Sequence, residues 1–427
     1  MSGMKEMWVI GLALFSMFFG AGNVIFPPYL GYTSGSQWPL SFFCYYMADI
    51  GLAIAAIFAM LKCGSDIDGV TGKIGIWPAK IMSLLIVLCI GPLIAIPRTA
   101  ATTYELSVIP LLGNFNGSLF SVLFFCLVWQ LSIKESSVLD IVGKLLTPVL
   151  FISLLAIGIK SFLTPLGEIV VRHNTADVVS SGIMAGYQTM DVMAALIFGV
   201  IILKTLADKG YTNIAQKNKM VAGASMISGV GLLLVYCGLT HLGATISSIF
   251  PPNITRVNLV TESVRLLFGR GGIIILSVMV ALACLTTAIG LTSSAGAYIE
   301  KLSNNKIGYK AVVTAVCIFS AVISTMGVEA IVKYAALVLS LLYAPILTLI
   351  VLSLVVNKHT PDSVFKGGAL GAFSISASVL ALKHGIKIFS FVEILPFHRF
   401  DLGWVGPAFV GAILGYFYTA FNREREE

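Results

Sequence analysis

Long hydrophobic stretches alternate with short polar segments along the whole chain. The first stretch, "WVIGLALFSMFFGAGNVIFPPYLGY", is apolar enough to enter a membrane, yet Gly20, Gly22, Asn23, Pro27 and Pro28 interrupt it. A helix of about 20 apolar residues crosses a bilayer, and the pattern therefore predicts about twelve spans. They are residues 7–30, 38–60, 78–108, 117–134, 141–163, 183–205, 220–248, 272–299, 310–326, 329–355, 364–383 and 403–421.

Composition places the chain in the lipid bilayer. Of its 427 residues, 57% are hydrophobic and only 11% are charged, whereas a soluble domain carries about 25% charge. We therefore expect an all-α integral membrane protein with one domain spanning residues 1–427. The net charge of +7 does not indicate a nucleic-acid partner, because lysine and arginine concentrate in the loops on one side of the predicted topology. By the positive-inside rule that side is the cytoplasm, and both termini lie there.

Two of the predicted spans are interrupted. Besides the first, the sixth span, "GIMAGYQTMDVMAALIFGVII", contains Gly182, Gly186 and Asp191 in its first half. Non-helical backbone inside a membrane persists only where protein or a water-filled cavity satisfies it, and an intramembrane carboxylate marks a functional site. Broken helices five spans apart predict two inverted five-helix repeats, at 1–163 and 183–355, followed by two accessory helices at 364–421.

The first break predicts a binding site for a charged ligand. A half-helix that begins near Val24 would direct the amides of Ala21, Gly22 and Asn23 at an anion. The preceding half-helix, which ends near Phe19, would offer carbonyl oxygens to a hard cation. A carboxylate substrate that binds together with Na⁺ fits both ends.

Hydroxyl groups cluster in the eighth span, in "ACLTTAIGLTSSAGAY". A single Ser or Thr in a membrane helix usually bonds back to its own backbone. The density of this cluster beside Gly290 instead indicates oxygen ligands for Na⁺. Its members are Thr286, Thr287, Thr292, Ser293 and Ser294.

Three further ionisable side chains lie within spans. Arg98 and Glu105 are seven residues apart and share one helix face. We favour neutralisation by each other or by neighbouring spans over a gate or a proton-linked pair. The pattern names no partner for Asp49. The loop at 249–271 predicts a short helix lying across the outer face.

Four stretches carry a resemblance to a known family. "FFGAGNVIFPP", "GPLIAIPRTAATTYE", "GYQTMDVMAALIFG" and "ACLTTAIGLTSS" resemble the bacterial branched-chain amino acid:cation symporter family over nearly the whole chain. The resemblance implies the leucine-transporter fold and Na⁺-coupled uptake of leucine, isoleucine and valine through the bacterial cytoplasmic membrane. Na⁺ would be the coupling ion, with no other cofactor and no obligate protein partner.

The resemblance also implies roles for individual residues. The substrate carboxylate would meet the amides of Ala21 and Gly22. Asp191 departs from the pattern, in which a small hydroxyl residue stands, and we infer that it faces the substrate ammonium instead. Asn23 would serve a second Na⁺ with Thr189. The ligands implied for the first Na⁺ are the carbonyls of Ser16, Phe19 and Ile289 and the hydroxyls of Thr292 and Ser293.

Branched side chains require an apolar pocket, which we expect Tyr104, Met190 and Met193 to line. Such a pocket distinguishes one methylene by only about 1–3 kcal/mol, which predicts overlapping use of the three substrates.

Other classes of protein fit the sequence less well. The five histidines form no paired motif that would indicate a membrane enzyme. A channel would show no uphill accumulation. An H⁺-coupled carrier that uses Asp191 or Glu105 remains the alternative within the class of carriers.

Overall fold

The structure is a computed structural model that describes residues 2–64, 66–133, 138–171, 174–211, 213–357 and 359–426. These ranges contain helices, turns and loops and no strand. Seven helical segments are long and apolar enough to cross a membrane: Ala21–Cys63, Ile76–Leu112, Thr175–Asp208, Ile214–Thr245, Arg256–Leu302, Val328–Val355 and Asp362–Lys383. Gly117–Ile133, Pro148–Leu163 and Tyr309–Ser324 are shorter apolar helices. The all-α class is thus confirmed.

Each predicted span falls on one helix or on consecutive helices. The α-helices are α1 (Ser2–Phe18), α2 (Ala21–Ser34), α3 (Trp38–Tyr46), α4 (Leu52–Cys63), α5 (Ile67–Thr71), α6 (Ile76–Leu88), α7 (Ala95–Thr103), α8 (Ile109–Leu112), α9 (Gly117–Ile133), α10 (Val138–Leu163), α11 (Thr175–Thr189), α12 (Asp191–Asp208), α13 (Ile214–Thr245), α14 (Arg256–Leu302), α15 (Tyr309–Ser324), α16 (Val328–Val355), α17 (Asp362–Lys383) and α18 (Val405–Glu426). Short 3₁₀ segments are η1 (Gly35–Gln37), η3 (Gly72–Ile74), η6 (Lys387–Ile394) and η7 (His398–Phe400).

Both predicted interruptions are present. The first separates α1 from α2 at Phe19 and Gly20, and the second separates α11 from α12 at Met190. Three π-helical turns widen other spans: η2 (Met47–Gly51), η4 (Cys89–Leu93) and η5 (Tyr104–Val108). Such turns often occur at functional sites.

The helix predicted before the eighth span is also found. It forms the first part of α14, beginning at Arg256, and a break at Gly269 with φ 63° separates it from the remainder of α14.

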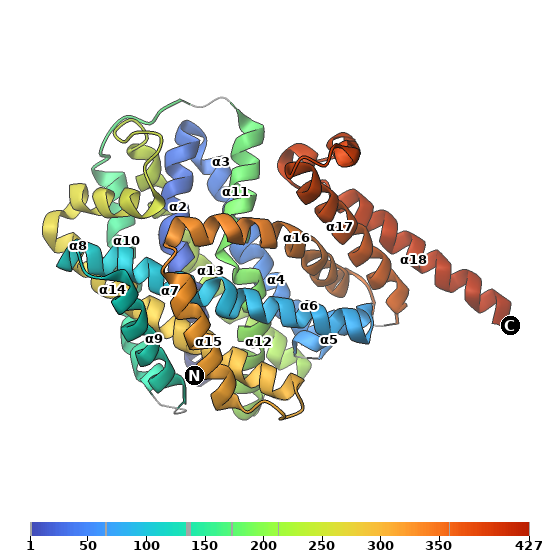
Figure 1. Cartoon of the computed structure of the whole chain (residues 1–427). Helices are drawn as coiled ribbons and strands as arrows, with labels where there is room; N and C mark the ends of the chain where they lie inside the picture. Colours follow the sequence, from blue (N-terminus) through green and yellow to red (C-terminus); the bar gives the residue numbers. More distant parts are fainter. Residues whose placement is uncertain are drawn as a thin grey trace.

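Helix α2 lies in the middle of the bundle beside α11 and α13 (Figure 1). Glycines allow α2 and α13 to approach closely. A Cβ on Gly31 would lie 1.8 Å from the Thr240 carbonyl oxygen, and one on Gly243 would lie 1.8 Å from that of Pro28. Only glycine fits these two positions, so the second half of the broken helix is held firmly in place.

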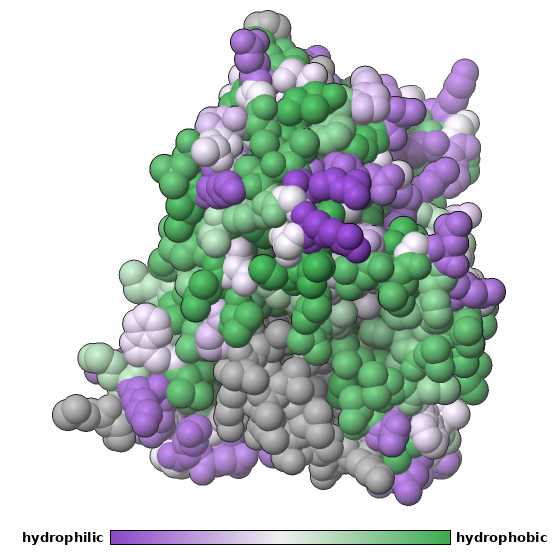
Figure 2. All heavy atoms as spheres, turned by 90° about the vertical axis from the view of Figure 1, so that its left-hand side faces the viewer, coloured by the Kyte–Doolittle hydropathy of each residue, from purple (hydrophilic) through white to green (hydrophobic). Residues whose placement is uncertain are grey.

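The outer surface is that of a protein surrounded by lipid. Hydrophobic residues cover broad areas of the described part of the face in Figure 2, while hydrophilic residues gather in its upper half, including a patch just above the centre, and at its lower corners. Large apolar side chains such as Phe417 and Phe421 of α18 are exposed. In Figure 1, α17 and α18 pack together at one side, and α18 extends away from the bundle. Among the helices of the core, α17 packs mainly against α16.

Candidate functional site

A small cavity lies between the two breaks, with a volume of about 30 Å³. One water molecule needs roughly 10–15 Å³ measured in this way, so a branched side chain enters only if the surrounding helices move apart. The cavity is lined by Met17, Gly20, Ala21, Gly22, Asn23, Ile90, Ala95, Arg98, Thr99, Thr189, Met190, Asp191, Ala194, Phe198, Thr287 and Leu291. Both broken helices thus contribute their interrupted segments to one site.

The first break places helix-terminal groups at this cavity. Gly20 is extended, with φ −110° and ψ −174°, and α2 begins at Ala21 rather than near Val24 as predicted. The amides of Ala21 and Gly22 lie in the first turn of α2, where a helix provides no acceptor for them. The backbone N–H of Asn23 instead donates to the Gly20 carbonyl at 3.1 Å. The predicted anion site is therefore reduced to Ala21 and Gly22.

Arg98 of α7 binds the C-terminal end of α11 at the second break. Met190 has a left-handed conformation with φ 70°, and α11 ends just before it. The Arg98 guanidinium donates to the carbonyls of Gln188 and Thr189 at 2.5 and 2.9 Å. It thereby supplies positive charge where the α11 dipole is negative.

Glu105 does not line the cavity. Its Oε1 accepts a hydrogen bond from the backbone N–H of Val328 at 2.8 Å. Arg98 and Glu105 therefore do not pair with each other, and each bonds to backbone groups of another helix. The charge neutralisation that we favoured from the sequence stays a prediction.

A buried polar network joins the two breaks. The side-chain nitrogen Nδ2 of Asn23 lies 2.7 Å from Oδ2 of Asp191, 2.6 Å from the Tyr236 hydroxyl oxygen and 2.5 Å from the Phe18 carbonyl oxygen. An amide nitrogen has two hydrogens, so it donates to two of these acceptors at a time. Asn23 Oδ1 is buried and receives no donor among the described residues.

Asp49 is the member of this network whose partner the sequence did not reveal. It lies on the π-helical turn η2, is 0% exposed, and accepts from the Thr189 hydroxyl at 2.7 Å. The sequence also did not identify Tyr236 of α13 as a member of this network. The residues around a tyrosine in an apolar span do not show which distant residue its hydroxyl contacts. The π-helical turn η2, which carries Asp49, could not be predicted from the residue pattern and is seen only in the backbone of the structure.

The five predicted Na⁺ ligands lie on α14 and at the end of the first half-helix, and none of them lines the cavity. Thr292 is 0% exposed, and its hydroxyl has no hydrogen-bond partner in the described part of the chain. Ile289 is buried beside it on α14, and Ser293 is partly buried. Ser16 and Phe19 lie at the end of the first half-helix, where Phe19 is buried and Ser16 partly buried. The Na⁺ assignment stays a prediction.

Two of the expected pocket residues lie elsewhere. The Tyr104 hydroxyl donates to the Phe115 carbonyl at 2.6 Å, and its ring packs on Phe120. Met193 is fully buried in the core and does not line the cavity. Met190 does line it, and the other apolar wall residues are Ile90, Ala95, Ala194, Phe198 and Leu291. Periodicity alone does not distinguish these residues from ordinary core residues.

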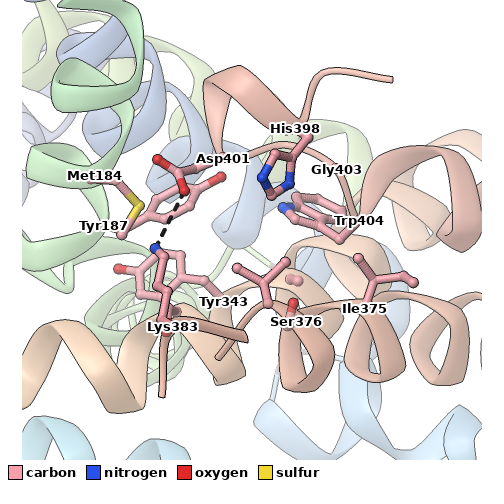
Figure 3. Close-up of a pocket in the computed structure, with 13 residues that line it drawn as sticks. Met184, Tyr187, Tyr343, Ile375, Ser376, Lys383, His398, Asp401, Gly403 and Trp404 are labelled. Atoms are coloured by element: carbon pink, nitrogen blue, oxygen red, sulfur yellow. Dashed lines mark ion pairs between the residues drawn. The ribbon is translucent and has the colours of Figure 1, made fainter. Parts of the chain in front are cut away.

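A second hollow lies beside the part of the sixth span before the break, between α11, α16, α17 and the segment at 398–404 (Figure 3). There Lys383 and Asp401 form an ion pair at 3.6 Å, and the rings of Tyr187 and Tyr343 stack at 4.4 Å. Asp401 also accepts from Ser180 of α11. This hollow joins α17 and the segment at 398–404 to α11, the part of the sixth span before the break, and it shares no lining residue with the cavity.

Close packing at Gly186 sets the position of Asp49. A Cβ there would lie 2.9 Å from the Tyr45 carbonyl oxygen and 3.0 Å from the Asp49 nitrogen. We expect Gly186→Ala to push α11 away from η2 and to destabilise the protein by about 1–3 kcal/mol. Thermal unfolding in detergent measures this. Gly271→Ala, which meets nothing within 4 Å, is the control, and equal melting temperatures for the two variants would contradict the prediction.

A polar site between two discontinuous helices is typical of secondary transporters, and solved structures share this fold. The chain superposes on Mhp1 in an inward-facing conformation with a TM-score of 0.62, 14% identity, and coverage of 97% of this chain and 91% of Mhp1. A Na⁺-coupled sialic acid symporter in a substrate-bound outward-open state gives 0.60 and 14%, with coverage of 96% and 90%. These similarities establish a fold like that of the leucine transporter.

The family follows from sequence. A model of the family "Branched-chain amino acid transport protein" matches residues 3–422, and the chain belongs to that family. The branched-chain amino acid permease BraB of Bacillus subtilis is 34% identical over 434 residues, which cover 98% of this chain and 96% of the permease. The chain is therefore a multi-pass transporter of this family, as the resemblance implied.

Proposed function

We propose that this protein is a secondary active transporter that couples Na⁺ entry to the uptake of leucine, isoleucine and valine across the bacterial cytoplasmic membrane. The observation that carries the proposal is the cavity in which both helix breaks meet Arg98 and Asp191. A relative named as a branched-chain amino acid permease supports the substrate class. Both termini would be cytoplasmic, and residues 1–163 and 183–355 would form inverted repeats with 364–421 as accessory helices.

The two charged ends of an amino acid fit different parts of the site. The carboxylate would bind the free amides of Ala21 and Gly22 at the N-terminus of α2, and the ammonium would face Asp191. The branched side chain would then point toward Met190 and Phe198. Because Met190 and Phe198 are apolar and distinguish one methylene only weakly, overlapping use of the three substrates is expected.

The buried oxygens support the cation sites. The Thr292 hydroxyl and the Asn23 side-chain oxygen are buried without hydrogen-bond partners among the described residues. Oxygen atoms of this kind suit a hard cation. One Na⁺ would bind Thr292 and Ser293 with the backbone carbonyls of Ser16, Phe19 and Ile289. A second would bind Asn23 beside the substrate carboxylate, with Thr189.

Uptake of radiolabelled leucine into proteoliposomes tests the proposal. We expect uphill accumulation under an inward Na⁺ gradient. Moving one Na⁺ through about 100 mV yields about 2.3 kcal/mol, enough for considerable accumulation before any Na⁺ gradient is added. Uptake driven by an H⁺ gradient without Na⁺ would favour the H⁺-coupled alternative, and flux without accumulation would indicate a channel.

Thr292→Ala is expected to raise the Na⁺ concentration that gives half-maximal leucine uptake by about tenfold, because it removes one charge-assisted ligand. The matched control is Thr286→Ala. Thr286 lies on the same helix, but its hydroxyl bonds back to the carbonyls of Leu282 and Ala283 at 3.1 and 2.9 Å. A Na⁺ dependence that is the same in both variants would contradict the role of Thr292.

A further inference from the structure

We propose that Asp401 is a positioning residue of transport: it ties α11 to the two C-terminal helices while the cavity is narrow, and this contact separates when a substrate enters. The inference rests on the proposed function, because it concerns the movement that admits the amino acid. It also gives a role to the hollow of Figure 3 and to the C-terminal helices, which the broken spans do not explain.

Helix α11 forms part of the cavity wall. It ends at the second break, and the carbonyls of its last two residues, Gln188 and Thr189, accept from the Arg98 guanidinium. Thr189 lines the cavity, whose volume of about 30 Å³ admits a branched side chain only when the helices move apart. An opening at this wall requires α11 to part from one of its neighbours.

One face of α11 is packed backbone to backbone. A Cβ on Gly182 would lie 2.6 Å from the Ser41 carbonyl oxygen of α3, and one on Gly186 would lie 2.9 Å from that of Tyr45 on the same helix. Packing this dense leaves little room for the two helices to shift against each other. We therefore expect α11 and α3 to move together.

The opposite face of α11 meets its neighbours through side chains and free space. Ser180, Met184 and Tyr187 recur at intervals of four and three residues and share one helix face. Met184 and Tyr187 line the hollow, whose volume is about 40 Å³, while Ser180 donates to Asp401 and the Tyr187 ring stacks on that of Tyr343. Because few side chains bridge this hollow, it is the side on which α11 can part.

Asp401 is held in place for this contact. Its φ of 57° is left-handed, a conformation that costs energy outside glycine and is found mainly at functional sites. Its carboxylate accepts from Ser180 and pairs with Lys383, the last residue of α17. Helices α17 and α18 on either side pack so closely that a Cβ on Gly367 would lie 2.0 Å from the Gly411 carbonyl oxygen. They provide a firm anchor for Asp401.

The strength of the contact suits one that forms and breaks in each transport cycle. The side chains of Lys383 and Asp401 are 53% and 28% exposed. Water therefore replaces their ion pair at little cost, whereas a fully buried pair would be costly to separate.

A reversible cross-link tests the separation. In the double variant Ser180→Cys/Asp401→Cys the two thiols are oxidised to a disulfide, and leucine uptake into proteoliposomes is measured before and after reduction. We expect oxidation to reduce uptake by about tenfold or more, because the linked protein cannot populate the state that admits the substrate, and reduction to restore it. Each single variant, oxidised in the same way, is the control. Uptake that the disulfide leaves unchanged would overturn the inference and leave the transporter function standing.

Variants of the partners test the same contact without altering Asp401. Ser180→Ala and Lys383→Gln each weaken the closed contact, so we expect each to lower the half-saturating leucine concentration about threefold. A purely structural role would raise it or reduce the amount of folded protein. Ser340→Ala is the matched control, because Ser340 lines the hollow but donates to the Leu337 carbonyl of its own helix at 2.8 Å. A half-saturating concentration that does not fall in either variant would contradict the proposal.

Labelling of Ser180→Cys with a water-soluble maleimide provides a readout that needs no leucine. We expect the purified protein to be labelled about threefold faster when Lys383→Gln is added, because the contact opens more often. Wild-type protein, labelled in parallel, accounts for the seven native cysteines. Equal rates would overturn the inference. Faster labelling of a protein that takes up no leucine would leave the contact standing and refute the proposed substrate.

Discussion

Replacement of Arg98 with alanine is expected to abolish leucine uptake, with a loss of about 100-fold or more. Arg98 is 4% exposed and makes two hydrogen bonds to the end of α11. Each bond from a charged donor contributes about 1.5–3 kcal/mol. Alanine would leave the Gln188 and Thr189 carbonyls without these donors, so the second break would lose its geometry. Initial rates of leucine uptake at equal protein density measure the effect.

Two further variants separate charge from geometry. Arg98→Lys retains the positive charge but lacks the planar fork that reaches two carbonyls, so we expect it to recover only part of the lost uptake. Arg265→Ala removes an exposed arginine that pairs with Glu262 at 3.3 Å and controls for loss of positive charge. If Arg98→Ala transported leucine within twofold of the wild type, the role given to Arg98 would be wrong.

The positions of the two breaks could be predicted from sequence because their signals are local. Gly20 lies at the first break and Asp191 directly follows the second, which falls at Met190. Gly22 and Asn23 lie inside α2 and Gly186 lies inside α11, so these predicted interruptions were displaced by a few residues. The start of α2 differed from the prediction by three residues. We expected Val24 and found Ala21, because Gly20 alone provides the extended residue that begins the helix.

Partners across the bundle could not be predicted in the same way. The contacts from Asn23 to Tyr236 and from Thr189 to Asp49 join residues more than a hundred positions apart. They depend on how helices pack and on the extra residue of a π-helical turn, neither of which follows from hydrophobic periodicity. For the same reason Tyr104 and Met193 looked like pocket residues, since an apolar side chain in a span can face a cavity or the core.

The polar site therefore depends on packing that the hydrophobic residues provide. Helix α2 contacts α13 through Gly31 and Gly243, and α11 contacts η2 through Gly186. These close approaches place Asn23, Thr189 and Asp191 in one network. The close contacts hold one side of each break rigidly in place. The helices can therefore bend at the non-helical residues of the breaks when a substrate enters the small cavity.

Gly22→Ala is expected to reduce leucine uptake by about tenfold, since strain of about 1–3 kcal/mol accompanies an extra methyl group in a packed site. A Cβ on Gly22 would lie 3.0 Å from the Arg98 Nη2 atom and 3.2 Å from its Cζ. It would displace the guanidinium from the carbonyls of α11 and cover the amides proposed to bind the carboxylate. The half-saturating leucine concentration should rise together with this loss.

Gly20→Ala is the matched variant in the same break. A Cβ there meets nothing within 4 Å, and the φ of −110° is open to any residue. We therefore expect it to retain most of the uptake that Gly22→Ala loses. The comparison separates two explanations of a glycine-rich break: flexibility of the backbone, which both substitutions would reduce, and room for Arg98, which only the second glycine provides. Equal losses in the two variants would favour flexibility and contradict the steric role of Gly22.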